Sequence, residues 1–338
     1  MVRIDYDISD DSDYLFTSAE LRTREREFLD KNRIERMVRS AKLDEFFKIL
    51  RDTVYSGYIN DVENSGNFDK VLIEEYGNTV KFLSERLKPG DMAAVGILFL
   101  EENLHNLKTV IKSVILDRDL ESLFIPILDS YQTLRGAALT ENYKEIRESI
   151  SEVLSFAVGL IGLQKNYRFM ELELEKFYLK KMFDSVKKID RRFIIDYLRH
   201  IIDIYNIKNI CRNKYLSEDF DFDSFIYENG FLTRKYLMEF RNESLDSFIK
   251  EMERTDYSDI VTKGINALHS GRTFSAFEKN EDLFRIDFFE PVKFTVSNLE
   301  RIFQFFLIKK LELKYLNIIH TGIIYGIERN KIEDKVKV

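Results

Sequence analysis

One sequence pattern occurs twice in this chain, at positions far apart. The segment LDEFFKILRDTVYS begins at Leu43, and LDSFIKEMERTDYS begins at Leu245. Both segments contain Leu, Asp, Phe, Lys, Thr, Tyr and Ser at the same spacing. Their shared Thr-x-Tyr endings are formed by Thr53, Tyr55, Thr255 and Tyr257. A pattern repeated at this distance restricts the fold to one built from related units.

A second pattern extends the repeat to three copies. HNLKTVIK begins at His105, YNIKNICR at Tyr205 and KYLNIIHT at Lys314. The residues at equivalent positions are Asn106, Asn206 and Tyr315, which are separated by nearly equal steps. We expect a middle copy of the first pattern near residues 144–157, but KEIRESISEVLSFA lacks Thr-x-Tyr there. That copy is therefore degenerate or absent.

The chain is predicted to be all-α. Only 13 Gly and 3 Pro interrupt 338 residues, which favours long helices over a turn-rich β-fold. Apolar residues follow a helical stripe at 68, 72, 76, 80, 83 and 87. Lys88-Pro89-Gly90-Asp91 ends that helix, and a second helix runs to about Ile115. Similar helical pairs are expected at 165–187 with 191–212, around Lys188-Ile189-Asp190, and at 291–325.

These pairs define three similar helical-bundle domains. We place them at residues 1–117, which include an acidic N-terminal segment, at 118–216 and at 217–338. Three copies of one unit can pack head to tail with pseudo-threefold symmetry. An open solenoid is the alternative, although solenoid repeats are usually shorter, at about 20–45 residues.

Composition limits the functional class. Lys and Arg number 52 against 59 Asp and Glu, and this net charge of −7 argues against a general nucleic-acid binder. The single Cys211 cannot form an internal disulfide, which fits a reducing compartment. The acidic N-terminus lacks the features of a secretory signal. The longest apolar run, MAAVGILFL at 92–100, is too short to cross a bilayer.

The sequence shows no familiar catalytic, cofactor-binding or metal-binding motif. Neither GxxxxGK[ST] nor GxGxxG occurs, and the histidines at 105, 200, 269 and 320 lack metal-ligand spacing. Asp219, Asp221 and Asp223 begin like a calcium loop, but Ser224 and Gly230 replace the required Gly and Glu. The acidic run Asp10-Asp11-Ser12-Asp13 resembles a magnesium motif without a partner motif. An all-α metal-dependent lyase or transferase therefore remains an alternative, as does a free-standing helical adaptor.

A basic segment at 21–39 offers a candidate docking face. Arg22, Arg26 and Arg33 fall on roughly one face of a continuous helix and are candidates for binding an acidic helix or loop end. The alternative is a solvated helix with internal ion pairs. We also predict Asn32 and Glu35 as a capping pair before IERMVRSA.

Five segments in order resemble the C-type subunit of prokaryotic A/V-type rotary ATPases, the family of the vacuolar d-type subunit. They are Tyr14 to Arg22, Leu43 to Tyr55, Asn103 to Lys112, Ile189 to Arg212 and Lys310 to Gly322. The resemblance spans nearly the whole chain. Glu20 stands where that family often has Arg, and Tyr315 stands where it usually has Asn.

This resemblance implies a funnel of three helical domains that catalyses no reaction and binds no cofactor or metal. Such a protein sits on the membrane rotor ring of proteolipid subunits and receives the central shaft, which contains D-type and F-type subunits. It transmits torque in the central stalk for proton or sodium transport and ATP synthesis or hydrolysis. The implied location is cytoplasmic and peripheral to the membrane. No nucleic-acid partner and no transmembrane span are expected.

Overall fold

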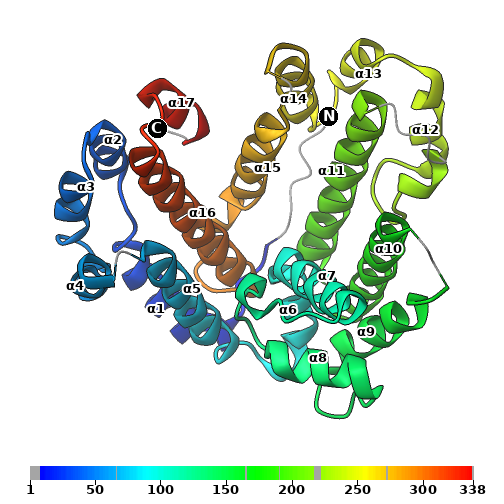
Figure 1. The fold of residues 1–338 in the computed structure, drawn as a ribbon, viewed down its shortest axis with the longest axis horizontal. Coiled ribbons are helices and arrows are strands. Elements are labelled where there is room, and N and C mark those ends of the chain that lie inside the picture. The colour runs from blue at the N-terminus through cyan, green and yellow to red at the C-terminus, as the bar shows by residue number, and fades with distance from the viewer. Residues whose placement is uncertain are drawn as a thin grey trace. The chain divides into compact units, whose positions relative to one another are not determined.

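The structure is a computed structural model that describes residues 8–65, 67–163, 166–189, 191–216, 222–271 and 273–336. Within these ranges the regular structure consists of α-helices and short 3-10 helices, and no strand occurs (Figure 1). The predicted all-α class is confirmed.

Contacts divide the chain into two compact units. Unit 1 contains Leu87–Phe277, and unit 2 contains Asp7–Arg86 together with Glu278–Val338. Unit 2 is thus built from both ends of the chain. The division into three domains at 117 and 216 stays a prediction.

Unit 1 contains two sets of helices, the first built on the long helix α7 and the second on the long pair α10 and α11. After η2 (Pro89–Asp91), the first set is α6 (Met92–Leu98), α7 (Leu100–Leu116), η3 (Glu121–Leu123), α8 (Tyr131–Thr140) and α9 (Glu148–Leu160). The second set is α10 (Tyr167–Val186), η4 (Lys187–Ile189), α11 (Arg192–Leu216), η5 (Phe222–Phe225), α12 (Arg234–Glu239), η6 (Phe240–Asn242), α13 (Leu245–Met252) and α14 (Ser258–Gly271).

The sequence predicts the helices of unit 1 in part. The single helix expected to run to about Ile115 is divided at Phe99 into α6 and α7. Pro89 opens η2, because its fixed φ suits a first helical position. The expected pair around residues 187–191 is present as α10 and α11. Asp190, part of the predicted turn, lies outside the described residues. Asn166 caps α10 by accepting hydrogen bonds from the backbone N–H groups of Arg168 and Phe169.

Unit 2 combines helices from both ends of the chain. From the N-terminal end come η1 (Ser12–Tyr14), α1 (Leu15–Glu25), α2 (Lys31–Arg39), α3 (Leu43–Leu50), α4 (Ser56–Ser65) and α5 (Phe68–Ser84). From the C-terminal end come most of α15 (Ser275–Phe288), η7 (Glu290–Phe294), α16 (Leu299–Ile324) and α17 (Arg329–Lys335).

Two predicted helix boundaries are wrong. The last helical pair is α15 and α16, so its first helix begins at Ser275 rather than near 291. Asn298 begins α16 by accepting a hydrogen bond from the Arg301 N–H. The capping pair Asn32 and Glu35 is not formed. Asp30 is the N-cap of α2 and accepts from the Arg33 N–H, so Asn32 lies inside the helix.

The core of unit 2 joins residues that are far apart in sequence. Aromatic side chains of α3 and α5 surround α16, and the ring centroids of Phe68 and His320 lie 4.4 Å apart. Phe46 and Phe47 of α3 also pack on His320. As predicted from its apolar sequence, α16 is buried along most of its length. Figure 1 shows the blue N-terminal helices beside the red C-terminal helices. The two chain ends therefore share one hydrophobic core.

A buried glycine of unit 1 tests the packing of α14. A Cβ atom at Gly264 would lie 2.4 Å from the Phe277 ring. We expect Gly264→Ala to lower the unfolding free energy by about 1–3 kcal/mol, because the rigid ring cannot move aside. Urea unfolding followed by circular dichroism measures this. Gly77→Ala is the control, since nothing lies within 4 Å of a Cβ there. An equal loss in both variants would contradict the packing argument.

Candidate functional site

Two asparagines predicted to be equivalent make the same pair of hydrogen bonds. The Asn106 side chain on α7 donates to the Ile125 carbonyl at 2.8 Å and accepts from the Ile125 N–H at 2.9 Å. The Asn206 side chain on α11 donates to the Tyr227 carbonyl at 2.9 Å and accepts from the Tyr227 N–H at 2.7 Å. Each amide thus fixes the backbone of the loop that follows its own helix.

The two Thr-x-Tyr segments also have the same local structure. Thr53 donates to the Leu50 carbonyl at 2.6 Å, and its hydroxyl accepts from the Tyr55 N–H at 3.2 Å. Thr255 donates to the Met252 carbonyl at 2.8 Å, and its hydroxyl accepts from the Tyr257 N–H at 3.2 Å. Each threonine closes the turn after an eight-residue helix. A tyrosine then directly precedes the next helix.

Each turn tyrosine binds a buried carboxylate on a long helix. The Tyr55 hydroxyl donates to Glu312 Oε1 at 2.6 Å and accepts from Lys309 Nζ at 3.0 Å. The Tyr257 hydroxyl donates to Asp203 Oδ2 at 2.6 Å and lies 2.7 Å from His200 Nδ1. Since that hydroxyl gives its proton to Asp203, His200 Nδ1 is the donor to the phenol oxygen. We call these sets the Tyr55 cluster and the Tyr257 cluster.

The two clusters use the same positions on their helices. In α11, His200, Asp203 and Asn206 follow one another at intervals of three residues, on adjacent turns of one face. Lys309, Glu312 and Tyr315 do the same in α16. Tyr315 is buried, as is Asn206. The equivalence of Asn206 and Tyr315 stays a prediction.

A backbone contact completes each carboxylate. Glu312 accepts from the Leu29 N–H, and Leu29 directly precedes the N-cap Asp30 of α2. Asp203 accepts from the Leu232 N–H at 3.0 Å, and Leu232 directly precedes the N-cap Thr233 of α12. A buried carboxylate with several donors is stabilised, whereas one without them would cost several kcal/mol.

The middle copy keeps the position but changes the residues. Arg147 directly precedes α9, as the turn tyrosines precede α4 and α14. Its guanidinium donates to Asn103 on α7 at 3.3 Å and to the Asp129 carboxylate. Asn103 stands three residues before Asn106, as Asp203 stands before Asn206. The middle copy therefore lacks the eight-residue helix and the tyrosine, but it has its own Arg147 cluster.

Burial sets the electrostatics of the Tyr257 cluster. Burial raises the pKa of Asp203 to about 6, although hydrogen bonds from Tyr257 and two backbone N–H groups oppose this. Burial, together with the Arg199 charge, lowers the pKa of His200 to about 4. Burial and the neighbouring carboxylates also raise the pKa of both Tyr55 and Tyr257 above the usual value. Both hydroxyls remain donors at physiological pH.

Sequence reasoning found the tyrosines but missed their partners. Asp203 and Glu312 lie in two of the segments that carry the family resemblance, but no motif pairs them with the tyrosines, and Arg147 carries no motif. The available signal was their spacing, three residues before a repeat-equivalent residue or one residue before a helix. Neither cue points to a charged partner without coordinates.

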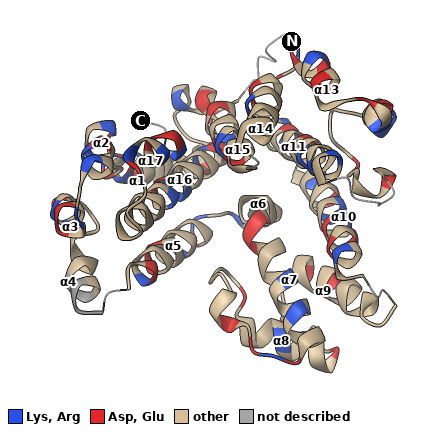
Figure 2. Ribbon diagram, turned by 45° about the horizontal axis from the view of Figure 1, so that its top comes forward, with Lys and Arg blue, Asp and Glu red and all other residues tan. Residues whose placement is uncertain are grey.

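The basic docking candidates do not share one helix. Arg22 lies on α1 and Arg33 on α2, and Arg26 follows the end of α1 at Glu25. The prediction of one continuous helical face is wrong, because Asp30 starts a new helix. Arg22 donates to the Thr295 carbonyl at 2.8 Å, and Arg33 lies 3.5 Å from Asp30. Figure 2 shows basic residues along α2. A docking role for the three arginines stays a prediction.

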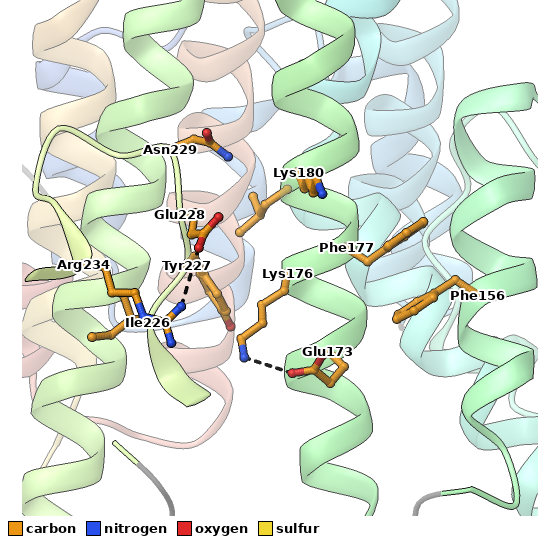
Figure 3. Close-up of a pocket in the computed structure, with 11 residues that line it drawn as sticks. Phe156, Glu173, Lys176, Phe177, Lys180, Ile226, Tyr227, Glu228, Asn229 and Arg234 are labelled. Carbon is orange, nitrogen blue, oxygen red and sulfur yellow. Dashed lines mark hydrogen bonds and ion pairs between the residues drawn. The ribbon is translucent and has the colours of Figure 1, made fainter. Parts of the chain in front are cut away.

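A pocket of about 240 Å³ lies in unit 1 beside α10 (Figure 3). The rings of Phe156 and Phe177 stack in its wall with centroids 4.2 Å apart. Several of its charges are paired locally: Lys176 contacts Glu173 at 2.9 Å, and Arg234 lies 3.5 Å from Glu228. Because these charges already have partners, the pocket attracts a charged ligand only weakly.

The acidic motifs have structural partners. Asp10 accepts from the N–H groups of Val296 and Ser297, and Asp11 caps η1 through the Asp13 N–H. Asp223 binds Arg234 at 2.7 Å. Asp219 and Asp221 lie outside the described residues.

The described residues offer neither a metal-binding cluster nor a membrane span. No group of three or more His, Cys, Asp or Glu is placed there to hold a metal ion. Within the same ranges, no helix is both long and apolar enough to cross a membrane.

Comparison with known proteins matches nearly the full length of the chain. The model of the family described as ATP synthase (C/AC39) subunit matches residues 17–335. The chain is 23% identical to the C subunit of the A-type ATP synthase of Methanocaldococcus jannaschii, covering 94% of this chain and 85% of that protein. It is 26% identical to the same protein of Methanobrevibacter smithii, with 80% and 73% covered. It is 21% identical to the C subunit of the V-type sodium ATPase of Enterococcus hirae, with 89% and 91% covered. The resemblance inferred from the sequence is confirmed.

The opposed pKa shifts predict a pH dependence that single substitutions reveal. A raised Asp203 pKa contributes stability at low pH that is lost as pH rises through about 6. A lowered His200 pKa contributes stability above pH 6.5 that is lost as pH falls through about 4. The two contributions oppose each other between pH 4 and 6. In Asp203→Asn we expect the unfolding free energy to rise with pH across this window, and in His200→Gln to fall.

Urea unfolding of both variants at about pH 4, 5, 6 and 7 measures these slopes. A difference of about 2 pKa units corresponds to about 2–3 kcal/mol. Parallel pH profiles in the two variants would refute the assignment.

The asparagine pairs predict unequal costs of truncation. Tyr227 is buried, whereas Ile125 is half-buried. Asn206→Ala leaves two buried backbone groups without partners, and we expect a loss of about 2–4 kcal/mol. Asn106→Ala is expected to cost about 1–2 kcal/mol, because water can reach the freed groups. Chemical denaturation tests the order, and a larger loss at Asn106 would contradict it.

Proposed function

Because the chain belongs to the ATP synthase (C/AC39) subunit family, we propose that it is the central-stalk socket of a rotary V-type or A-type ATPase. It joins the rotor shaft, with D-type and F-type subunits, to the membrane ring of proteolipid subunits. It transmits torque for ion transport and catalyses no reaction. It acts on the cytoplasmic side, peripheral to the membrane.

One observation carries this proposal: the family match extends over residues 17–335. This range includes both units and all three clusters, from Tyr55 to Glu312. The similarity therefore concerns the whole helical framework rather than one local site. A structural role that involves the whole chain is the function that a match of this extent supports best.

The clusters suit a part that carries load. Tyr55, Glu312 and Lys309 connect a turn to a long helix inside the core of unit 2. Lys309 also contacts Glu75 of α5 at 2.9 Å, so one ammonium group joins three segments. Hydrogen bonds to charged groups contribute about 1.5–3 kcal/mol each, and a close-packed interior resists compression. Such a unit transmits force with little deformation.

Unit 2 also presents an apolar surface for a partner. The Phe16 side chain is 80% exposed and that of Phe294 is 88% exposed, with Leu15 and Val296 beside them in sequence. Asp10 and Arg22 fix the segment after Phe294 to the start of the chain and to α1. Apolar side chains that are exposed together in one patch mark interaction sites. We assign this surface to another subunit of the complex.

Substitution of the two phenylalanines tests the surface. We expect Phe16→Ser with Phe294→Ser to leave the melting temperature unchanged, since both rings are exposed, and to reduce co-purification with partner subunits at least tenfold. Leu163→Ser in unit 1 is the matched control, because that side chain is 76% exposed. Equal recovery of partners with both variants would rule out the surface.

A pull-down of the tagged chain from native membranes tests the function itself. Recovery of shaft and ring subunits is the expected result. Recovery of soluble signalling proteins alone would favour the free-standing adaptor.

A further inference from the structure

In two of the three clusters, the residue that contacts the long helix comes from a segment that follows this helix in the chain. In the Tyr55 cluster, it comes from the N-terminal residues. Tyr257 reaches Asp203 of α11 from a segment that comes after α11 in the chain. Arg147 reaches Asn103 of α7 from a segment that comes after α7. Tyr55 reaches Glu312 of α16, but its segment comes at the opposite end of the chain, 257 residues earlier.

The agreement extends beyond the tyrosines. Asp30 and Thr233 are both N-caps, and the residue before each donates its N–H to the helix carboxylate. The same order follows in both places: a capped helix, an eight-residue helix, a Thr-x-Tyr turn and a last helix. In unit 2 these are α2, α3 and α4, and in unit 1 they are α12, α13 and α14.

We propose that residues 8–65, the N-terminal segment, are the detached final part of the third copy, and that α16 with α5 forms a docking surface for them. The chain is then a circularly shifted three-copy repeat. This differs from a division at 117 and 216, which assigns the N-terminal segment to the first copy. The segment is held by contacts along its length, and the peptide link to α5 is not needed to keep it in place.

The segment contacts the C-terminal helices at several places. At its start, the Asp11 N–H donates to the Ser297 carbonyl at 2.6 Å. Glu25 accepts from buried Arg301 at 2.9 Å, and the Phe28 and Phe305 rings lie 5.0 Å apart. Farther along the segment, Arg329 of α17 donates to the Arg39 carbonyl at 2.9 Å. Apolar burial by α3 adds the larger contribution, since Phe46 and Leu50 are fully buried.

A cut in the folded, full-length chain tests the proposal. A protease site inserted between Ser65 and Asn67 is cleaved after folding, and the nicked protein is analysed by size exclusion over a dilution series. We expect both pieces to elute together at micromolar concentration with unchanged helical content. Separation of the pieces at that concentration would overturn the proposal.

Two isosteric variants show whether the Tyr55 cluster holds the segment. Tyr55→Phe removes one hydroxyl from the docking contact, and we expect the dissociation constant of the nicked protein to rise at least tenfold. Tyr257→Phe removes the equivalent hydroxyl inside unit 1, and we expect no change in that constant. Equal weakening by both variants, or none by Tyr55→Phe, would reject the assignment. Since the purified chain is used without partner subunits, the outcome is independent of the proposed function.

Discussion

A buried carboxylate on a long helix is the constraint on which the arrangement of the shorter helices depends. Asp203 and Glu312 lie in the interior, where an ionised group without donors would cost several kcal/mol. Each has donors outside its own helix, at a turn tyrosine and at the backbone before an N-cap. Glu312 has one further donor, Lys309, on α16 itself. The shorter helices must therefore be in place before the long helix is stable. This couples local turn chemistry to tertiary packing, and it explains why the same turn recurs in the sequence.

The three clusters each connect the residue before a helix to a polar side chain on a long helix, and they do so with different charged groups. The Tyr55 cluster pairs its phenol with a lysine, the Tyr257 cluster uses a histidine, and the Arg147 cluster replaces the phenol with a guanidinium. Buried polar groups of different chemistry favour one set of partners over another, because a wrong pairing leaves a charge unsatisfied. Related segments within one chain are thereby directed to different helices. The apolar packing that surrounds them supplies most of the stability and cannot by itself distinguish the copies.

Much of the fold could be predicted because helices depend on local periodicity and on few breakers. The all-α class and the pair of α10 and α11 followed from such patterns and were confirmed. The first predicted pair was found in part, since α5 belongs to unit 2 and the second helix is divided into α6 and α7 of unit 1. The start of α16 and the break between α1 and α2 were missed, since Asn298 and Asp30 act as caps that resemble ordinary polar residues. The tyrosines of the clusters could be found from the repeat. The pairing with their carboxylate partners could not, because contacts between residues 54 and 257 positions apart leave no periodic trace in a single sequence.

The pairing of the first helices with the last has a consequence for synthesis on the ribosome. Tyr55 leaves the exit tunnel long before Glu312, and 257 residues separate them. At the usual rate of about 5–20 residues per second, the wait is roughly 10–50 s. During that time Phe46, Phe47 and Leu50 have no α16 to cover them and are open to chaperones and to aggregation. A nascent chain that stops before α16 would keep these apolar side chains exposed permanently. Chaperones and proteases could recognise incomplete chains by this exposed apolar surface.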